Sequence, residues 1–321
     1  MDRFQRSWQL LQSSFAVMSR DRKLLLFPLL TTVFTGLLAL LFLAPIALEP
    51  TGHRLTTAAH WIAVGNSLYS VDTAEDAGAA GVTPGDTHPH RYARANGVRP
   101  LAVAYFVVMY FASMYLATFF NVAFYSQILN ALRGEPVSIA GGLRFAATKW
   151  QAILMWTAFA GLLGYVIKSL EQRFGLIGQI ILKLIGTAWS VACVFVIPVI
   201  VTDAKAVNPF QVLKQSALTL KRTWGESLIG YAGVSFGTAL VLLLSVVWLG
   251  GGILLAVSLH FWWLIAVVAA VWLMAIVLWT YLLSVASQIF RCALFLYASQ
   301  GSLPAPYTDE MMAMAWRMKK R

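Results

Sequence analysis

The sequence predicts an all-α protein: a polytopic transmembrane helical bundle of six spans, with amphipathic helices on its cytoplasmic surface. Apolar residues make up 59% of the chain and charged residues only 12%, whereas soluble proteins are about a quarter charged. Six apolar runs each have about the 20 residues that cross roughly 30 Å of hydrocarbon as a helix. The basic residues gather in alternate gaps between these runs.

The apolar runs set the boundaries of the expected spans. These are Leu24–Leu48, Pro100–Ile128, Gln151–Ile167, Ile180–Thr202, Leu228–Val257 and Trp262–Leu283. The chain then divides into a cytoplasmic amphipathic helix (1–23), the first span (24–48), an outer loop (49–99), five further spans with basic cytoplasmic linkers (100–297) and a cytoplasmic amphipathic tail (298–321). The first run is longer than the roughly 7–15 apolar residues of a secretory signal, so we expect it to stay as an anchor.

The distribution of charge predicts the orientation. Most of the 24 lysines and arginines fall in the gaps that an even number of spans would place on the same side as both termini. The positive-inside rule therefore places both termini in the cytoplasm, and the setting that fits is a bacterial cytoplasmic (inner) membrane. A net charge of +11 suggests nucleic acid in a soluble protein. Here its distribution fits anionic lipid headgroups instead, and no nucleic-acid partner is predicted.

The N-terminal segment has the pattern of an amphipathic helix. Its apolar residues follow four- and three-residue steps, which place them on one helical face: Phe4, Trp8, Leu11, Phe15 and Met18. Arg3, Arg6 and Arg20 supply positive charge for a lipid surface. The helix either lies on the membrane surface or packs against the cytoplasmic ends of the bundle, and the two interpretations are compatible.

The same pattern returns at 136–150 and again after Asn208 and Pro209, a pair that favours a helix start. The second helix would present one apolar face, formed by Phe210, Leu213, Ala217, Leu220 and Trp224. Each basic surface helix precedes a transmembrane hairpin, so the chain resembles three similar units. The expected contacts with the lipid surface are Arg3, Arg6, Trp8, Lys214, Lys221 and Arg222.

The outer loop and the last hairpin carry further local signals. The stretch Asp72–His90 is rich in Ala, Gly, Asp and Thr, and we expect disorder there. The more apolar Thr56–Ser70 predicts a short helix. A turn at Ser258–Phe261, rather than at the three glycines of 250–252, divides the following apolar run into two membrane-crossing lengths. The last helix is expected to continue to about Tyr297.

Polar residues within the spans suggest a second possibility. Gln179 and Lys183 lie one helical turn apart, and Asn121 and Gln127 lie in the second span. Together they define a possible polar pathway, since ionisable residues inside a membrane are often functional. The alternatives are that the lysine reaches the interface along its own stem and that the amides join helices. Asp203 is expected to pair with Lys205.

Signatures of catalysis are absent from the sequence. We find no Walker or Rossmann glycine pattern, no His-Glu-x-x-His and no Gly-x-Ser-x-Gly. Asp86, His88 and His90 lack a fourth ligand, so no metal site is predicted. No catalytic residue and no cofactor are predicted, and Cys193 and Cys292 are expected to be packing residues.

Two stretches carry a resemblance to known families. The opening, Ser14-Phe15-Ala16-Val17 with Arg20-Asp21-Arg22-Lys23 and the apolar run to Pro28, resembles that of an uncharacterised prokaryotic six-span membrane protein family. The stretch Pro198-Val199-Ile200 through Asn208-Pro209, with Ser216 and Trp224, is similar to the hairpin linker of membrane domains attached to glycerophosphodiester phosphodiesterases. The resemblance implies a helical membrane bundle and transfers no enzymatic activity, because the phosphodiesterase barrel needs about 250 residues.

These observations leave three hypotheses about function. The first is a non-enzymatic bundle that acts through contacts with lipids, chiefly anionic headgroups at the cytoplasmic face, or with proteins, including a homo-oligomer. The second is a permease or channel for a small solute, ion or lipid that uses the polar pathway. The third, a lipid enzyme, has the least support, because clustered acidic and histidine residues are missing from the spans.

Overall fold

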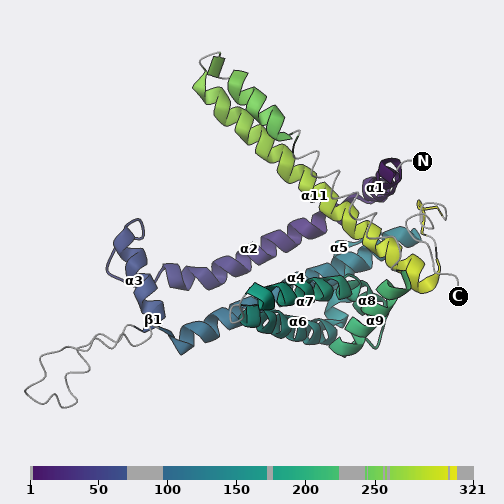
Figure 1. Ribbon diagram of the computed structural model, residues 1–321, viewed down its shortest axis with the longest axis horizontal. Helices are drawn as coiled ribbons and strands as arrows, with labels where there is room; N and C mark the ends of the chain where they lie inside the picture. The colour runs from purple at the N-terminus through teal and green to yellow at the C-terminus, as the bar shows by residue number, and fades with distance from the viewer. Residues whose placement is uncertain are drawn as a thin grey trace, which may run out of the picture. The chain divides into compact units, whose positions relative to one another are not determined.

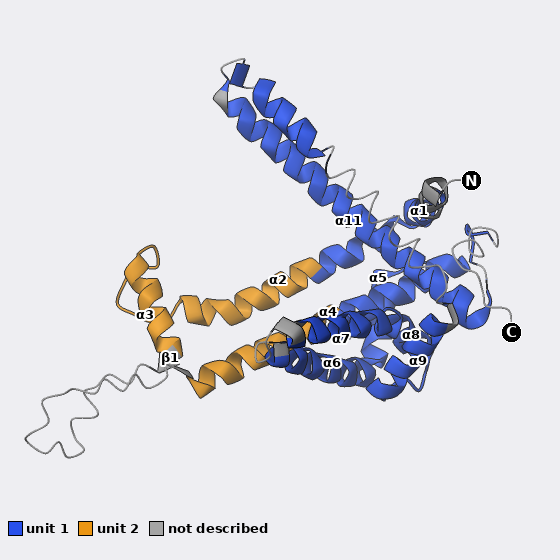
Figure 2. Cartoon of the chain, in the orientation of Figure 1, with its two compact units in different colours: residues 1–31, 118–321 blue, residues 32–117 orange. Residues whose placement is uncertain are grey.

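The computed structural model is built almost entirely of helices (Figure 1). It describes residues 3–70, 97–171, 176–223, 243, 245–255, 257–258, 261–302 and 304–308. The elements in order are α1 (Arg3–Arg20), the 3₁₀ helix η1 (Arg22–Leu25), α2 (Leu26–Ala47), α3 (Ala58–Leu68), β1 (Tyr69–Ser70), β2 (Gly97–Val98), α4 (Pro100–Arg133), α5 (Ile139–Thr148), α6 (Trp150–Glu171), α7 (Leu176–Ala192), α8 (Val196–Thr202), α9 (Pro209–Thr223) and α11 (Trp262–Gln300). The chain forms two compact units, Met1–Thr31 with Thr118–Arg321, and Thr32–Ala117 (Figure 2).

Within the described residues, 5 helices are long and apolar enough to cross a membrane. They are Arg22–Ala47, Pro100–Arg133, Trp150–Leu170, Ile180–Thr202 and Trp263–Gln300. They coincide with five of the predicted spans, so the helical membrane fold is confirmed. The remaining predicted span, Leu228–Val257, lies largely outside the described residues, which include only its apolar helix Ser245–Leu255.

Unit 1 is closely packed at one end. Buried there are the start of α2, the last turns of α4, the first turns of α6, most of α8 and the C-terminal part of α11, with Phe27, Phe124, Ile153, Phe195 and Ile289 fully enclosed. We call this region, residues 14–27, 118–157, 195–221 and 281–308, the packed end. Away from it, apolar side chains such as Leu184 of α7 and Met274 of α11 are exposed. A continuous apolar surface of this kind is typical of helices that cross a membrane.

The packed end collects alternate ends of successive membrane helices. The side chain of Arg20 reaches the carbonyl of Ala131 near the end of α4. Lys149, just before α6, donates to the carbonyl of Asp203, just after α8, at 2.7 Å. A chain that crosses a bilayer back and forth must place its helix ends in this alternating order.

The N-terminal helix α1 packs on the bundle rather than standing apart from it. It contacts α11, and Ser14, Val17 and Met18 are buried. Phe15 and Leu11 of the predicted apolar face are half-buried. The side chains of Phe4 and Trp8 lie outside the described residues. For the described half of α1, packing against the bundle is therefore confirmed, and a position at the membrane surface stays a prediction.

The fourth span is interrupted, which the sequence analysis did not predict. Helix α7 ends at Ala192, residues 193–195 form turns, and α8 begins at Val196. Pro198 explains the break, because it has no N–H to donate to Val194 and is tolerated only in the first turn of a new helix. Ser216 of α9 provides hydrogen-bond partners for backbone groups at the break. Its hydroxyl donates to the carbonyl of Ala192 at 2.6 Å and accepts a hydrogen bond from the N–H of Phe195 at 3.1 Å.

Helix α9 begins where it was predicted, but its buried face is shifted. The N–H of Phe210 donates to the Oδ1 of Asn208 at 3.0 Å, so Asn208 caps the helix. The buried side chains are Val212, Ser216 and Thr219, whereas Phe210, from the predicted apolar face, is 67% exposed. The buried face is thus shifted by one residue from the face predicted by hydrophobicity. The reason is that Ser216, a polar residue, makes the buried contact with the interrupted fourth span.

The last hairpin does not turn at the three glycines of 250–252, and the middle of the predicted turn, 259–260, lies outside the described residues. Residues 250–252 are helical, and α11 begins at Trp262. Gly252 approaches Val268 so closely that a Cβ on the glycine would lie 2.6 Å from a valine methyl, which shows that the two helices pack together. Helix α11 runs to Gln300 and ends at Gly301, whose φ of 65° is the left-handed cap that glycine favours.

Unit 2 contains parts of α2 and α4 together with the described part of the outer loop. A predicted short helix in Thr56–Ser70 is present as α3. His60 of α3 is 1% exposed, and its Nε2 donates to the carbonyl of Ala47 at the end of α2 at 2.8 Å. The strands β1 and β2 pair antiparallel. The stretch Asp72–His90 lies outside the described residues.

Candidate functional site

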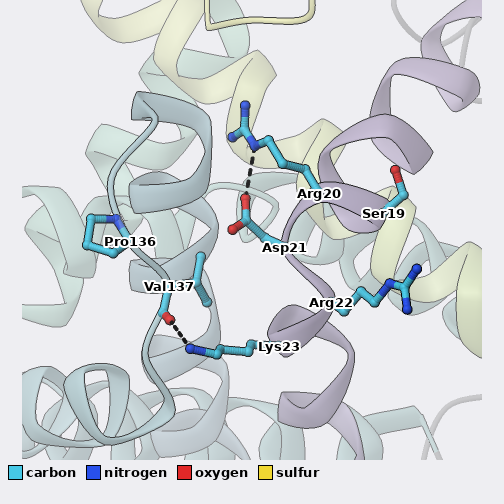
Figure 3. A pocket seen from close by; sticks show the side chains of 7 residues that line it. All are labelled: Ser19, Arg20, Asp21, Arg22, Lys23, Pro136 and Val137. Carbon is cyan, nitrogen blue, oxygen red and sulfur yellow. Dashed lines mark hydrogen bonds and ion pairs between the residues drawn. The ribbon is translucent and has the colours of Figure 1, made fainter.

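A basic pocket of about 410 Å³ lies where the chain passes from α1 into the first membrane helix (Figure 3). Helix α1 ends at Arg20, Asp21 has a non-helical backbone, and η1 starts at Arg22. Leu24 and Phe27 are fully buried directly afterwards, so the turn is held against the core and its charged side chains face outward. The pocket is lined by Ser19, Arg20, Asp21, Arg22, Lys23, Pro136 and Val137.

Hydrogen bonds to the backbone orient two of the cations. Arg20 donates through Nη2 to the carbonyl of Ala131, and its Nε donates to Asp21 Oδ2 at 3.1 Å. Lys23 Nζ donates to the carbonyl of Val137 at 3.4 Å (Figure 3). Ala131 belongs to the last turn of α4, where unpaired carbonyls carry partial negative charge. The pocket thus lies between the start of one membrane helix, at η1 and α2, and the end of the next, α4.

Positive charge exceeds negative charge in this pocket. Arg20, Arg22 and Lys23 line the pocket together with one carboxylate, that of Asp21, and the side chain of Arg22 extends away from this carboxylate (Figure 3). Among the described residues, the guanidinium of Arg22 makes neither an ion pair nor a hydrogen bond. Lys23 donates to a backbone carbonyl, which is neutral overall and does not compensate the positive charge of the lysine. The arrangement suits an anion, because guanidinium and ammonium groups make strong charge-assisted hydrogen bonds to oxyanions.

The predicted lipid-contact residues are placed as follows. Lys214 and Lys221 are exposed on α9, as a role at a lipid surface requires. Arg3, Arg6 and Trp8 lie in α1 and Arg222 lies in α9, but their side chains are outside the described residues. The pocket was not predicted from the sequence. The feature that could have indicated it is the unbroken charged run from Arg20 to Lys23 directly before an apolar span.

The residues of the predicted polar pathway are described only in part. Gln127 is buried, its Oε1 accepts the N–H of Ser138 at 2.8 Å, and its Nε2 donates to Ser126 at 3.3 Å. Its polar atoms therefore hold the loop that leads into α5. Asn121 is half-buried on α4 and Lys183 is exposed on α7. The side chain of Gln179 lies outside the described residues, so the pathway stays a prediction.

The expected ion pair between Asp203 and Lys205 is wrong. The Oδ1 of Asp203 accepts the backbone N–H of Lys205 at 2.8 Å, a turn-forming bond that competes with a side-chain pair. Lys149 instead donates to the carbonyl of Asp203. Burial lowers the pKa of Lys149, and the nearby Asp203 charge partly opposes this shift.

The two terminal regions meet in a buried contact. The hydroxyls of Ser14 in α1 and Tyr307 lie 2.8 Å apart and are hydrogen-bonded, and both side chains are buried. Burial raises the pKa of the Tyr307 phenol above its usual range, and the hydrogen bond with Ser14 opposes this only in part. The neutral phenol thus fastens the end of the described chain onto α1.

This contact should weaken at alkaline pH. The folded state binds the phenol proton of Tyr307 more tightly than the unfolded chain does, so its stabilisation is present below the ordinary tyrosine pKa of about 10 and is lost as pH rises above it. We expect the wild type to lose roughly 1 kcal/mol more than Tyr307→Phe between pH 8 and pH 11, since the unfolded chain releases the phenol proton above about pH 10 while the folded state keeps it, at about 1.4 kcal/mol per pH unit. Thermal unfolding of both proteins in detergent measures this, and parallel pH curves would contradict it.

Comparison with known proteins identifies a family without assigning an activity. The sequence profile described as "Family of unknown function (DUF6159)" matches residues 101–304. No curated protein and no solved structure matches the chain. The expectation of an uncharacterised family is thereby confirmed. The similarity to membrane domains attached to glycerophosphodiester phosphodiesterases, and the prokaryotic origin, stay predictions.

Proposed function

We propose that this chain, which belongs to DUF6159, a family of unknown function, acts through contacts with lipids as a multi-pass membrane protein. In this proposal it is not an enzyme, and it resides in a bacterial cytoplasmic membrane with both termini in the cytoplasm. Its packed end faces the cytoplasm and holds anionic headgroups. A homo-oligomer is compatible with this role.

One observation carries the proposal: basic side chains gather at the packed end, and most of them have no ion-pair partner among the residues that the structure describes. Arg20, Arg22, Lys23 and Lys149 all stand at the ends of apolar helices. In the part of the chain that the structure describes, the one ion pair is Arg20 with Asp21, and Arg20 is half exposed in it. An exposed pair of this kind contributes little. Headgroup phosphates at the same level of the membrane would supply the missing counter-charge.

The proposal is tested by the lipids that the full-length protein keeps. After reconstitution in equal parts of phosphatidylglycerol and phosphatidylcholine and gentle extraction, native mass spectrometry should find the anionic lipid enriched among the retained molecules. Enrichment should fall at about 1 M salt, where the Debye length is near 3 Å. Equal retention of both lipids at low salt would contradict the proposal.

A permease or channel is the second candidate, and the interruption between α7 and α8 favours it, because discontinuous helices form the binding sites of many transporters. The interruption is nevertheless closed: Phe195 is fully buried and Ser216 satisfies the free backbone groups. Flux into liposomes by the wild type and by Lys183→Ala tests this candidate. The absence of flux under every imposed gradient would exclude it.

A further inference from the structure

We propose that the pocket between Arg20 and Val137 is a discrete binding site for the phosphate group of an anionic membrane lipid. This inference rests on the proposed function and deepens it, because it assigns lipid recognition to particular side chains instead of to the basic surface as a whole. Three features carry it: the donors in the pocket, its level relative to the membrane, and the apolar track that leaves it.

The donors fit a phosphate group. The guanidinium of Arg22 presents a planar fork that matches two phosphate oxygens, and Lys23 has N–H donors beyond the one directed at Val137. Arg20 is held by Asp21 and by the carbonyl of Ala131, so its charge is fixed at the site without further loss of side-chain freedom. A volume of about 410 Å³ is within the usual range of small-ligand pockets.

The pocket lies at the level of the headgroups. The apolar segment Arg22–Ala47, which is long enough to cross a membrane, starts within the pocket, and α4 ends at Arg133, close to the opposite wall. Backbone and side chains at this depth meet phosphates rather than acyl chains or bulk water. Phosphate-bearing headgroups are therefore present next to the pocket at high local concentration.

The surface below the pocket distinguishes a lipid from a free phosphate ion. Arg22 opens the 3₁₀ helix η1, and Leu26 and Leu29 lie three residues apart on one side of α2, which follows it directly. Leu26 is 41% and Leu29 52% exposed, whereas the neighbouring Leu24 and Phe27 are buried. An acyl chain lying on these leucines would continue from a headgroup held at Arg22, whereas inorganic phosphate would gain nothing from them.

The decisive experiment compares two charge-neutralised variants of the full-length protein in detergent. Arg22→Gln/Lys23→Gln removes two charges from the pocket, and Arg144→Gln/Lys205→Gln removes two exposed charges of the packed end that lie outside it. Short-chain phosphatidylglycerol is titrated against each by native mass spectrometry. We expect the pocket variant to bind about tenfold more weakly than the wild type and the Arg144/Lys205 variant to change by less than about threefold, since only the former loses charge-assisted hydrogen bonds.

The other outcomes separate this inference from the proposed function. Equal losses in both variants would overturn the discrete site while leaving general lipid contact intact. A wild type with no preference for the anionic lipid would overturn both. Competition by inorganic phosphate at concentrations similar to the lipid would assign the pocket to a soluble anion and overturn the lipid site. If the double variant does not fold, Arg22→Gln alone decides the question, because no partner is recorded for that exposed side chain among the described residues.

Discussion

Replacing Gly142 with leucine should destabilise the packed end by about 3 kcal/mol or more, because the space for a side chain is already filled. A Cβ at this position would lie 2.9 Å from Cγ of Gln127, 3.0 Å from the carbonyl oxygen of Ala123 and 3.0 Å from the ring of Phe27. Two of these neighbours cannot move easily: one is helix backbone, and the other is a fully buried ring that stacks on Phe124 at 5.6 Å. Helix α5 would have to move away from α4.

Thermal unfolding in detergent measures the effect, with Gly186→Leu as the matched control. Gly186 also lies in a helix, α7, but nothing lies within 4 Å of a Cβ built there. The control should shift the unfolding midpoint by no more than a few degrees. Similar shifts in the two variants would show that the close approach at Gly142 is not a constraint on the fold.

The second large effect is expected for Ser216→Ala. This substitution leaves the N–H of Phe195 and the carbonyl of Ala192 without their side-chain partner at the break in the fourth span. Ser216 and Phe195 are fully buried, so water does not replace the lost bonds. We expect a loss of about 1–3 kcal/mol, the usual cost of an unsatisfied buried polar group, and faster hydrogen exchange at the amide of Phe195.

Ser190→Ala is the matched control for this prediction. Ser190 is an exposed serine of α7, and its hydroxyl bonds only to the carbonyl of Gly186 one turn earlier in the same helix. Its loss should leave stability and the exchange of Phe195 unchanged. Unaltered exchange in Ser216→Ala would mean that the break is maintained by Pro198 alone.

Much of the fold could be predicted from the sequence because the bilayer imposes one length and one composition on every span. Five spans and the helix starts at Asn208 and Trp262 depend on local signals that a single stretch of chain contains. The break at 193–195 was missed, although Pro198 marks it, since its stability depends on Ser216 more than 20 residues away. The buried face of α9 also differs from the predicted one, because the polar Ser216 is buried against the break in the fourth span.

The candidate site was harder to predict for the same reason. The run Arg20–Lys23 is plain in the sequence, but the walls it faces are the carbonyls of Ala131 and Val137, which lie 111 and 114 residues away from their partners. Residue patterns give no information about such distant neighbours. His60 illustrates the same point, because a histidine in a polar loop reveals nothing about the helix end it caps.

The short ladder of unit 2 has a consequence for how the outer loop can evolve. Tyr69 pairs with Val98, Ser70 pairs with Gly97, and the N–H of Arg99 donates to the carbonyl of Leu68 at 3.0 Å. This clamp joins the two ends of the segment at 71–96, so the geometry of the flanking helices does not depend on how many residues lie between. Because closing a longer loop adds only about 0.6 kcal/mol for each doubling of its length, epitopes or whole reporter domains should be accepted there without disturbing the membrane-embedded parts.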